Sequence, residues 1–216
     1  CAGVVALLAV FAVIMLWPLP VQLFTHLPGP AGNTDTPIYI WNMWYLLERT
    51  HDWFPNPFSQ QDTQLYPVGS PLIYHTSNFF YGLIAAPFWF LLGPVPAYNL
   101  VLFSTFLTAG LIAYLLGRFL GLSRAEALLA ATLFAFSPWR LKRAEQHLCL
   151  MQNDLFALYV LGLMLLAVKK KWRWPAVLCG VAFAAAFYVE MTASVHLVVI
   201  SLIFLAVYFR PRSRWR

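Results

Sequence analysis

Residues 97–117 read AYNLVLFSTFLTAGLIAYLLG, an apolar run without a charged residue. About 20 such residues suffice for a helix to cross the hydrocarbon core of a bilayer. The whole chain has a similar character, because 61% of its residues are hydrophobic and 10% are charged. Soluble domains have roughly 45–50% apolar and about 25% charged residues. The sequence therefore predicts an all-α integral membrane protein with several spans.

Further apolar segments accompany this run, and they occupy residues 1–24, 79–92, 125–136, 152–168, 174–189 and 192–209. Segment 79–92 is too short for an ordinary span and contains Pro87, so we expect it to lie as a juxtamembrane helix on the outer surface. The other segments, with 97–117, give six predicted spans and place both termini inside.

Basic residues give the predicted orientation. Most of them fall in three clusters, namely Arg118 and Arg124; Lys169, Lys170, Lys171 and Arg173; and Arg210, Arg212, Arg214 and Arg216. Cytoplasmic loops are enriched in Lys and Arg, which predicts that all three clusters lie inside, in a multi-pass protein of the cytoplasmic membrane. Because the +6 net charge is divided among separate clusters, nucleic acid is not a predicted partner.

A polar, aromatic-rich outer loop over residues 25–78 follows the first segment. Within it, residues 36–50 have apolar residues at helical spacing, with Asp35 suited to the N-cap and Pro37 to the first turn. This pattern predicts an amphipathic helix on the membrane surface.

The ends of the chain and its cysteines bear on its extent. It starts at Cys1 rather than at a Met and stops in a basic stretch, so we expect a piece of a longer protein. The three cysteines have no metal-like spacing, which argues against a disulfide framework or a zinc site.

Three segments are predicted to meet at the outer surface: the loop with Asp35 and His75, the connection 136–154, and the turn 188–192. They bring carboxylates, cations and aromatic residues to one level of the membrane. A transferase that uses a lipid phosphate needs these groups there, because the phosphate lies at the headgroup plane.

The motifs LYPVGSPLIYHTSNFFYGLIAAPFWFLLG (65–93), PAYNLVLFSTFLTAGLIAYLLGRFLG (96–121) and LFAFSPWRLKRAEQHL (133–148), together with the Asp of the first outer loop, carry a resemblance. The chain resembles the N-terminal module of integral-membrane glycosyltransferases of the GT-C class, relatives of the aminoarabinose and protein-mannosyl transferases. The resemblance implies a GT-C helical bundle and a polyprenyl-phosphate-linked sugar donor. It also implies that Asp35 acts on the acceptor.

Each candidate residue has an alternative role. Asp35 is the predicted general base, or only the cap of the following helix. Arg140, Lys142 and Arg143 are predicted to bind the donor phosphate, or to anchor the chain at lipid headgroups. His147 matches a His of the resembling proteins and is predicted to contact phosphate or sugar, or to be a hydrogen-bonded interfacial His.

Further candidates for substrate binding are Asp154, Glu190, Tyr188 and His75. Asp154 resembles the acid that opens the corresponding span in aminoarabinose-type transferases, with a helix N-cap as its alternative. Glu190 lies in apolar company between two spans, which marks a functional candidate, and its alternative is a water-exposed turn residue.

No metal site is predicted, although Asp35, Asp154 and Glu190 carry carboxylates of the kind that bind a divalent cation. The expected partners are the lipid-linked donor, an envelope glycan, lipid or protein acceptor, and membrane lipids. Two alternatives remain: a transporter or flippase of lipid-linked saccharide, which would need ionisable groups along a midplane pathway, and a non-catalytic membrane subunit.

Overall fold

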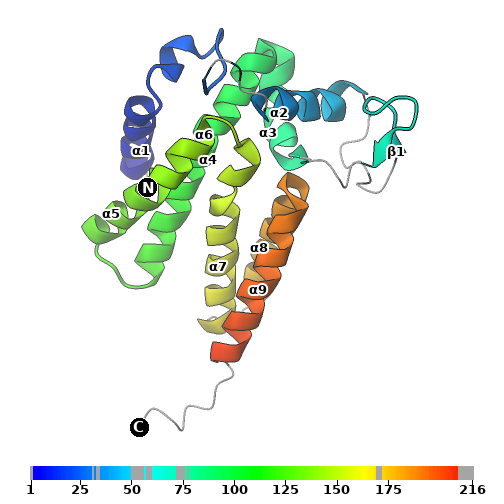
Figure 1. Cartoon of the computed structure of the whole chain (residues 1–216). Coiled ribbons are helices and arrows are strands. Elements are labelled where there is room, and N and C mark those ends of the chain that lie inside the picture. The colour runs from blue at the N-terminus through cyan, green and yellow to red at the C-terminus, as the bar shows by residue number, and fades with distance from the viewer. Residues whose placement is uncertain are drawn as a thin grey trace, which may run out of the picture.

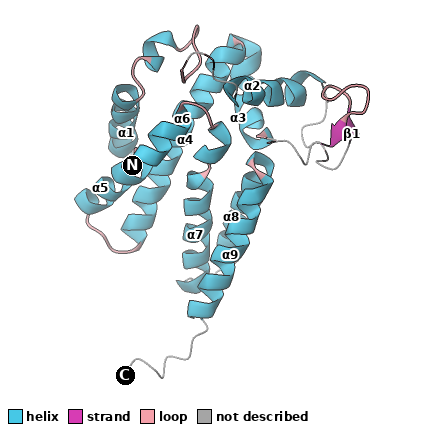
Figure 2. Cartoon of the chain, in the orientation of Figure 1, coloured by secondary structure: helices cyan, strands magenta, loops and turns pink. Residues whose placement is uncertain are grey.

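The computed structural model describes residues 2–30, 32, 35–49, 56, 60–71, 76, 78–168 and 172–208. The described part of the chain is mostly helical, with 79% of its residues in helices, and Figure 2 shows these helices beside one small strand pair. The elements in chain order are α1 Ala2–Met15, η1 Leu19–Gln22, α2 Asp35–Trp44, the π-helix η2 Tyr45–Arg49, β1 Gln60–Gln61, β2 Ser70–Pro71, α3 Phe79–Leu92, α4 Pro94–Phe119, α5 Arg124–Ala135, α6 Pro138–Ala144, η4 Leu148–Met151, α7 Asn153–Val168, α8 Arg173–Val189 and α9 Met191–Tyr208.

Three helical segments of the described chain are long and apolar enough to cross a membrane: Pro94–Phe119, Leu148–Val168 and Met191–Tyr208. They correspond to three of the six predicted spans. The helices at the other three positions are shorter, since α1 has 14 residues, α5 has 12 and α8 has 17.

The prediction of one uninterrupted span over residues 1–24 is wrong, because the helix there is shorter. Helix α1 ends at Met15, and the chain turns through Pro18 before the short helix η1. Proline removes a backbone donor, and it disfavours helical geometry at the residue before it, here Trp17. Asn99 then fixes the turn to the start of α4, because its side-chain amide donates to the carbonyls of Leu23 and His26 at 2.8 Å each.

The bundle has two distinct ends in Figure 1. Helices α2 and α3 lie toward the top of the view, whereas the turn between α4 and α5 and the C-terminal end of α9 lie toward the bottom. Helices α4 and α5 pack against each other, and α7 packs against both α8 and α9. Helices α2 and α3 and the turn between Arg118 and Arg124 therefore belong to opposite ends of the bundle.

Small residues allow close contacts between two pairs of helices, α1 with α4 and α7 with α8. A Cβ at Gly110 of α4 would lie 2.7 Å from a methyl carbon of Leu8 on α1, and a Cβ at Gly162 of α7 would lie 2.6 Å from the sulfur of Cys179 on α8. At Gly110 a larger residue would displace the Leu8 side chain, whereas at Gly162 it would also meet the backbone of α8 at 3.3 Å and force α7 and α8 apart. Close approach at small residues is the usual way for helices to associate within a membrane.

The two predicted surface segments both form helices. Together α2 and η2 cover Asp35–Arg49, and α3 covers Phe79–Leu92 as predicted. The π-helix η2 is fixed to α3 because the indole of Trp89 donates to the Glu48 carboxylate at 2.6 Å. The far end of α3 exposes Phe90 and Leu91, which suits a contact with lipid. The juxtamembrane position of α3 stays a prediction.

Cysteine labelling in intact cells tests the predicted topology, in which residues 25–96 and 137–152 lie outside. A Pro94→Cys variant should react with an impermeant maleimide added from outside, whereas Leu120→Cys at the opposite end should react only after the membrane is opened. Both positions are exposed, and a background in which Cys1, Cys149 and Cys179 are replaced removes the native thiols. Labelling of position 94 only from the cytoplasm would contradict the assignment of segment 79–92.

Candidate active site

Asp35 and His147 meet at the α2 end of the bundle. Asp35 is the first residue of α2, and His147 lies in the connection between α6 and α7. The Nε2 of His147 is 3.0 Å from the Oδ2 of Asp35, and 28% and 37% of the two side chains are exposed. The backbone N–H of His147 donates to the Arg143 carbonyl at 2.7 Å, which fixes its main chain to α6. The structure thus joins two predicted site residues in one solvent-accessible pair.

A carboxylate beside an imidazole is suited to proton transfer. When His147 is neutral and donates its Nε2 hydrogen to Asp35, its Nδ1 becomes the nitrogen that accepts a proton. When His147 is charged, the carboxylate stabilises the imidazolium by an ion pair. The pair can therefore take up a proton from a substrate hydroxyl and hold it.

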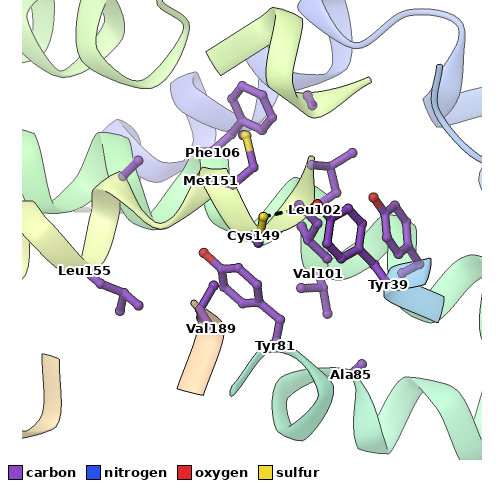
Figure 3. Close-up of a cluster of buried hydrophobic side chains, with 14 of the residues drawn as sticks. Tyr39, Tyr81, Ala85, Val101, Leu102, Phe106, Cys149, Met151, Leu155 and Val189 are labelled. Carbon is purple, nitrogen blue, oxygen red and sulfur yellow. Dashed lines mark hydrogen bonds between the residues drawn. The ribbon is translucent and has the colours of Figure 1, made fainter. Parts of the chain in front are cut away.

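A second, buried contact lies one helical turn further along α2. The Tyr39 hydroxyl and the Cys149 thiol share a hydrogen bond at 3.1 Å, which Figure 3 shows as a dashed line. Burial, reinforced by Cys149, raises the pKa of Tyr39, which keeps the phenol neutral. Tyr39 follows Asp35 by four residues, and so one face of α2 lies against the segment that holds both His147 and Cys149.

Arg140 lies in the interior, with 1% of its surface exposed. Its guanidinium donates to four oxygens: Ala135 O at 3.1 Å, Thr105 O at 2.9 Å, Met151 O at 2.8 Å and Asn153 Oδ1 at 3.4 Å. It also lies 5.2 Å above the ring of Phe106. The predicted phosphate contact does not fit this burial, because the donors face protein carbonyls. Arg140 instead joins α4, the end of α5 and the start of α7.

Asp154 is also buried, with 5% of its surface exposed. Its Oδ2 accepts from the hydroxyl of Thr108 at 2.7 Å, and its Oδ1 accepts from the backbone N–H of Leu155 at 2.9 Å. The positive charge of Arg140 also attracts the Asp154 carboxylate. A substrate contact does not fit here either, because Asp154 is enclosed between α4 and α7.

Lys142 and Arg143 remain at the surface. Lys142 Nζ lies 2.7 Å from the Glu145 carboxylate, with 71% of the lysine side chain exposed. Arg143 lies 5.8 Å above the ring of Trp139. A pair this exposed is worth about 0–1 kcal/mol, so an incoming phosphate can compete for Lys142.

A groove of about 570 Å³ runs beside the Lys142–Glu145 pair, between α6 and the segment that follows α1. Lys142 and Glu145 line it together with an apolar wall that includes Met15, Leu16, Trp17, Leu19, Leu102 and Leu141. The groove therefore combines the exposed Lys142–Glu145 ion pair with an apolar wall, and it adjoins the connection that holds His147.

The remaining predicted site residues are Glu190, Tyr188 and His75. Glu190 follows α8 and accepts from the Thr192 hydroxyl at 3.3 Å. Tyr188 packs against the apolar cluster of Tyr45, Leu46 and Phe79. His75 lies outside the described residues.

The sequence analysis did not identify the hydrogen bond between Tyr39 and Cys149 or the one that Thr108 donates to Asp154. The four-residue interval from Asp35 to Tyr39 was a signal for the first, whereas Thr108 stands in an apolar run with nothing to distinguish it. Within the part of the chain that the structure describes, no group of three or more His, Cys, Asp and Glu side chains is placed to hold a metal ion.

Comparisons with protein-family models, with curated proteins and with solved structures found no match to this chain. In its described residues the protein is mostly helical, and three of the helices there are long and apolar enough to span a membrane.

Proposed function

We propose that the protein is a membrane glycosyltransferase of the GT-C type. It would transfer a sugar from a polyprenyl-phosphate-linked donor to an envelope glycan, lipid or protein acceptor on the outer face of the cytoplasmic membrane. The observation that carries this proposal is the accessible Asp35–His147 pair, whose side chains approach to 3.0 Å.

In the proposed reaction, a hydroxyl of the acceptor attacks the anomeric carbon of the sugar. The bond from that carbon to the phosphate oxygen breaks, a new carbon–oxygen bond forms, and polyprenyl phosphate leaves. The Asp35–His147 pair accepts the hydroxyl proton as the new bond forms.

The groove beside α6 supports a lipid-linked donor. Its apolar wall suits an isoprenoid chain, and Lys142 offers a point charge to the phosphate. Lys142 lines the groove and His147 follows it by five residues, so we propose that the sugar of a donor bound at Lys142 extends toward the Asp35–His147 pair.

A transporter of lipid-linked saccharide is the alternative, and the buried groups favour it less. Asp154 is the only carboxylate in the described long apolar helices α4, α7 and α9, and it stands at the start of its helix. It is hydrogen-bonded by Thr108, whereas a transport pathway needs ionisable groups that can be reached near the midplane.

Donor binding tests the proposal directly. The protein in detergent micelles should bind polyprenyl monophosphate at least about tenfold more tightly than polyprenol of the same length, because only the former carries the charged group. Replacing Lys142 with Gln should weaken phosphate-lipid binding by about fivefold, the effect of one surface cation.

Arg173→Gln is the matched control, since it removes one positive charge at the start of α8 and should leave the dissociation constant unchanged. Equal affinity for polyprenol and its phosphate would overturn the proposed donor site. In proteoliposomes, movement of lipid-linked saccharide across the bilayer without formation of a glycosylated product would favour the transporter.

A further inference from the structure

We propose that the opposite end of the bundle binds the headgroup of an anionic phospholipid in a cavity between α1, α4 and α5. This cavity has a volume of about 650 Å³, and its lining includes Gly3, Val4, Tyr114, Leu115, Arg118 and Arg124. The inference requires a membrane location but does not depend on sugar transfer.

Two cations from different helices line the cavity. Arg118 lies in the last turn of α4, and Arg124 is the first residue of α5. One guanidinium N–H of Arg118 donates to the Leu122 carbonyl at 2.5 Å, which holds the side chain over the turn between the helices. Guanidinium groups bind phosphate oxygens through paired, charge-assisted hydrogen bonds, so this pair is suited to a phosphodiester.

The nearby acid does not neutralise the cavity. Glu126 is not part of its lining. Its carboxylate accepts from the backbone N–H of Ser123 at 2.7 Å, while its own N–H donates to the Ser123 hydroxyl. This capping box holds Glu126 at the start of α5, and the charged side chains that line the cavity are therefore both positive.

The rest of the lining favours a lipid over a free phosphate. Val4, Leu115 and Leu128 form an apolar wall. Further along α5, Leu129 and Leu133 are 62% and 65% exposed and continue the apolar surface away from the arginines. A headgroup at Arg118 and Arg124 would thus lie where the apolar helices end, with acyl chains along α4 and α5. Basic pockets between membrane helices recognise acidic lipid headgroups in this manner.

Native mass spectrometry of the protein released from micelles tests this site. The probes are phosphatidylglycerol and phosphatidylcholine of the same acyl chains, and the wild-type protein should retain the anionic lipid preferentially. The double variant Arg118→Gln/Arg124→Gln should weaken phosphatidylglycerol retention by about thirtyfold, since each cation near an anionic lipid contributes on the order of 1 kcal/mol.

Two further variants separate a built site from general attraction of charge. Lys171→Gln/Arg173→Gln removes the same charge between α7 and α8 in the sequence and should retain the lipid as the wild type does. Gly3→Phe keeps both arginines but fills the cavity, since a Cβ at Gly3 meets no atom within 4 Å, and it should also weaken retention.

Three results would overturn the inference. They are equal retention of both lipids by the wild type, an equal loss in both double variants, and unchanged retention in Gly3→Phe. Displacement of phosphatidylglycerol by inorganic phosphate at millimolar concentration would show that the arginines serve a soluble anion instead.

Discussion

Asp35→Asn is expected to lower the rate of sugar transfer by about 10² to 10⁴-fold, the usual contribution of a positioned general base. Asparagine has the same size and keeps an oxygen that can accept a hydrogen bond at the start of α2, so the helix should lose at most about 1 kcal/mol. The measurement is turnover of a polyprenyl-phosphate sugar by a variant whose thermal unfolding in detergent matches that of the wild type.

Asp62→Asn is the matched control, because Asp62 is an exposed carboxylate paired weakly with Arg49 at 3.6 Å. It should keep full activity. His147→Gln separates the roles within the pair, since glutamine can still donate to Asp35 but cannot take up a proton. A loss as large as that of Asp35→Asn would make the imidazole the base, and a small loss would make the carboxylate the base. Wild-type turnover in both variants would rule out the proposed site.

Arg140→Met is expected to destabilise the protein by about 3–5 kcal/mol, the usual effect of removing one partner from a buried charged network. The substitution leaves the carbonyls of Ala135, Thr105 and Met151 without this donor. It also leaves the buried carboxylate of Asp154 without an opposing charge. The unfolding midpoint in detergent and the yield of folded protein should both fall.

Arg143→Met provides the comparison, because Arg143 contacts the face of Trp139 at the surface. It should change the free energy of unfolding by less than about 1 kcal/mol. If Arg140→Met were as stable as the wild type and instead bound polyprenyl monophosphate more weakly, the assignment of a structural role to Arg140 would be wrong. The result would support the predicted contact of Arg140 with phosphate.

Local patterns predicted the helices well. The apolar run over residues 97–117 lies within α4, and the helices expected over 36–50 and 79–92 both form. These predictions rest on hydrophobic composition, on helical spacing and on Pro and Gly at the boundaries, all of which act within a few residues. The prediction of one span over residues 1–24 was wrong because Pro18 and Pro20 break the helix within an otherwise apolar segment.

The roles of the charged residues depended on distant partners. Arg140 and Lys142 stand two residues apart and look equivalent in the sequence, yet one is buried among carbonyls from three segments and the other is exposed. Nothing near Arg140 in the chain reveals that Thr105 and Met151 will supply its acceptors. The segments of Asp35 and His147 were predicted to meet at the outer surface, but the direct contact between the two side chains depends on how α2 packs near the α6–α7 connection.

The sequence by itself determined the helical, apolar character of this protein and the ends of its main helices, because burial in lipid and helix termination depend on composition and on neighbouring residues. Only the tertiary structure decided which polar side chains are enclosed by the protein and which face outward. A charge becomes structural or available through the segments that surround it, and those segments come from distant parts of the chain.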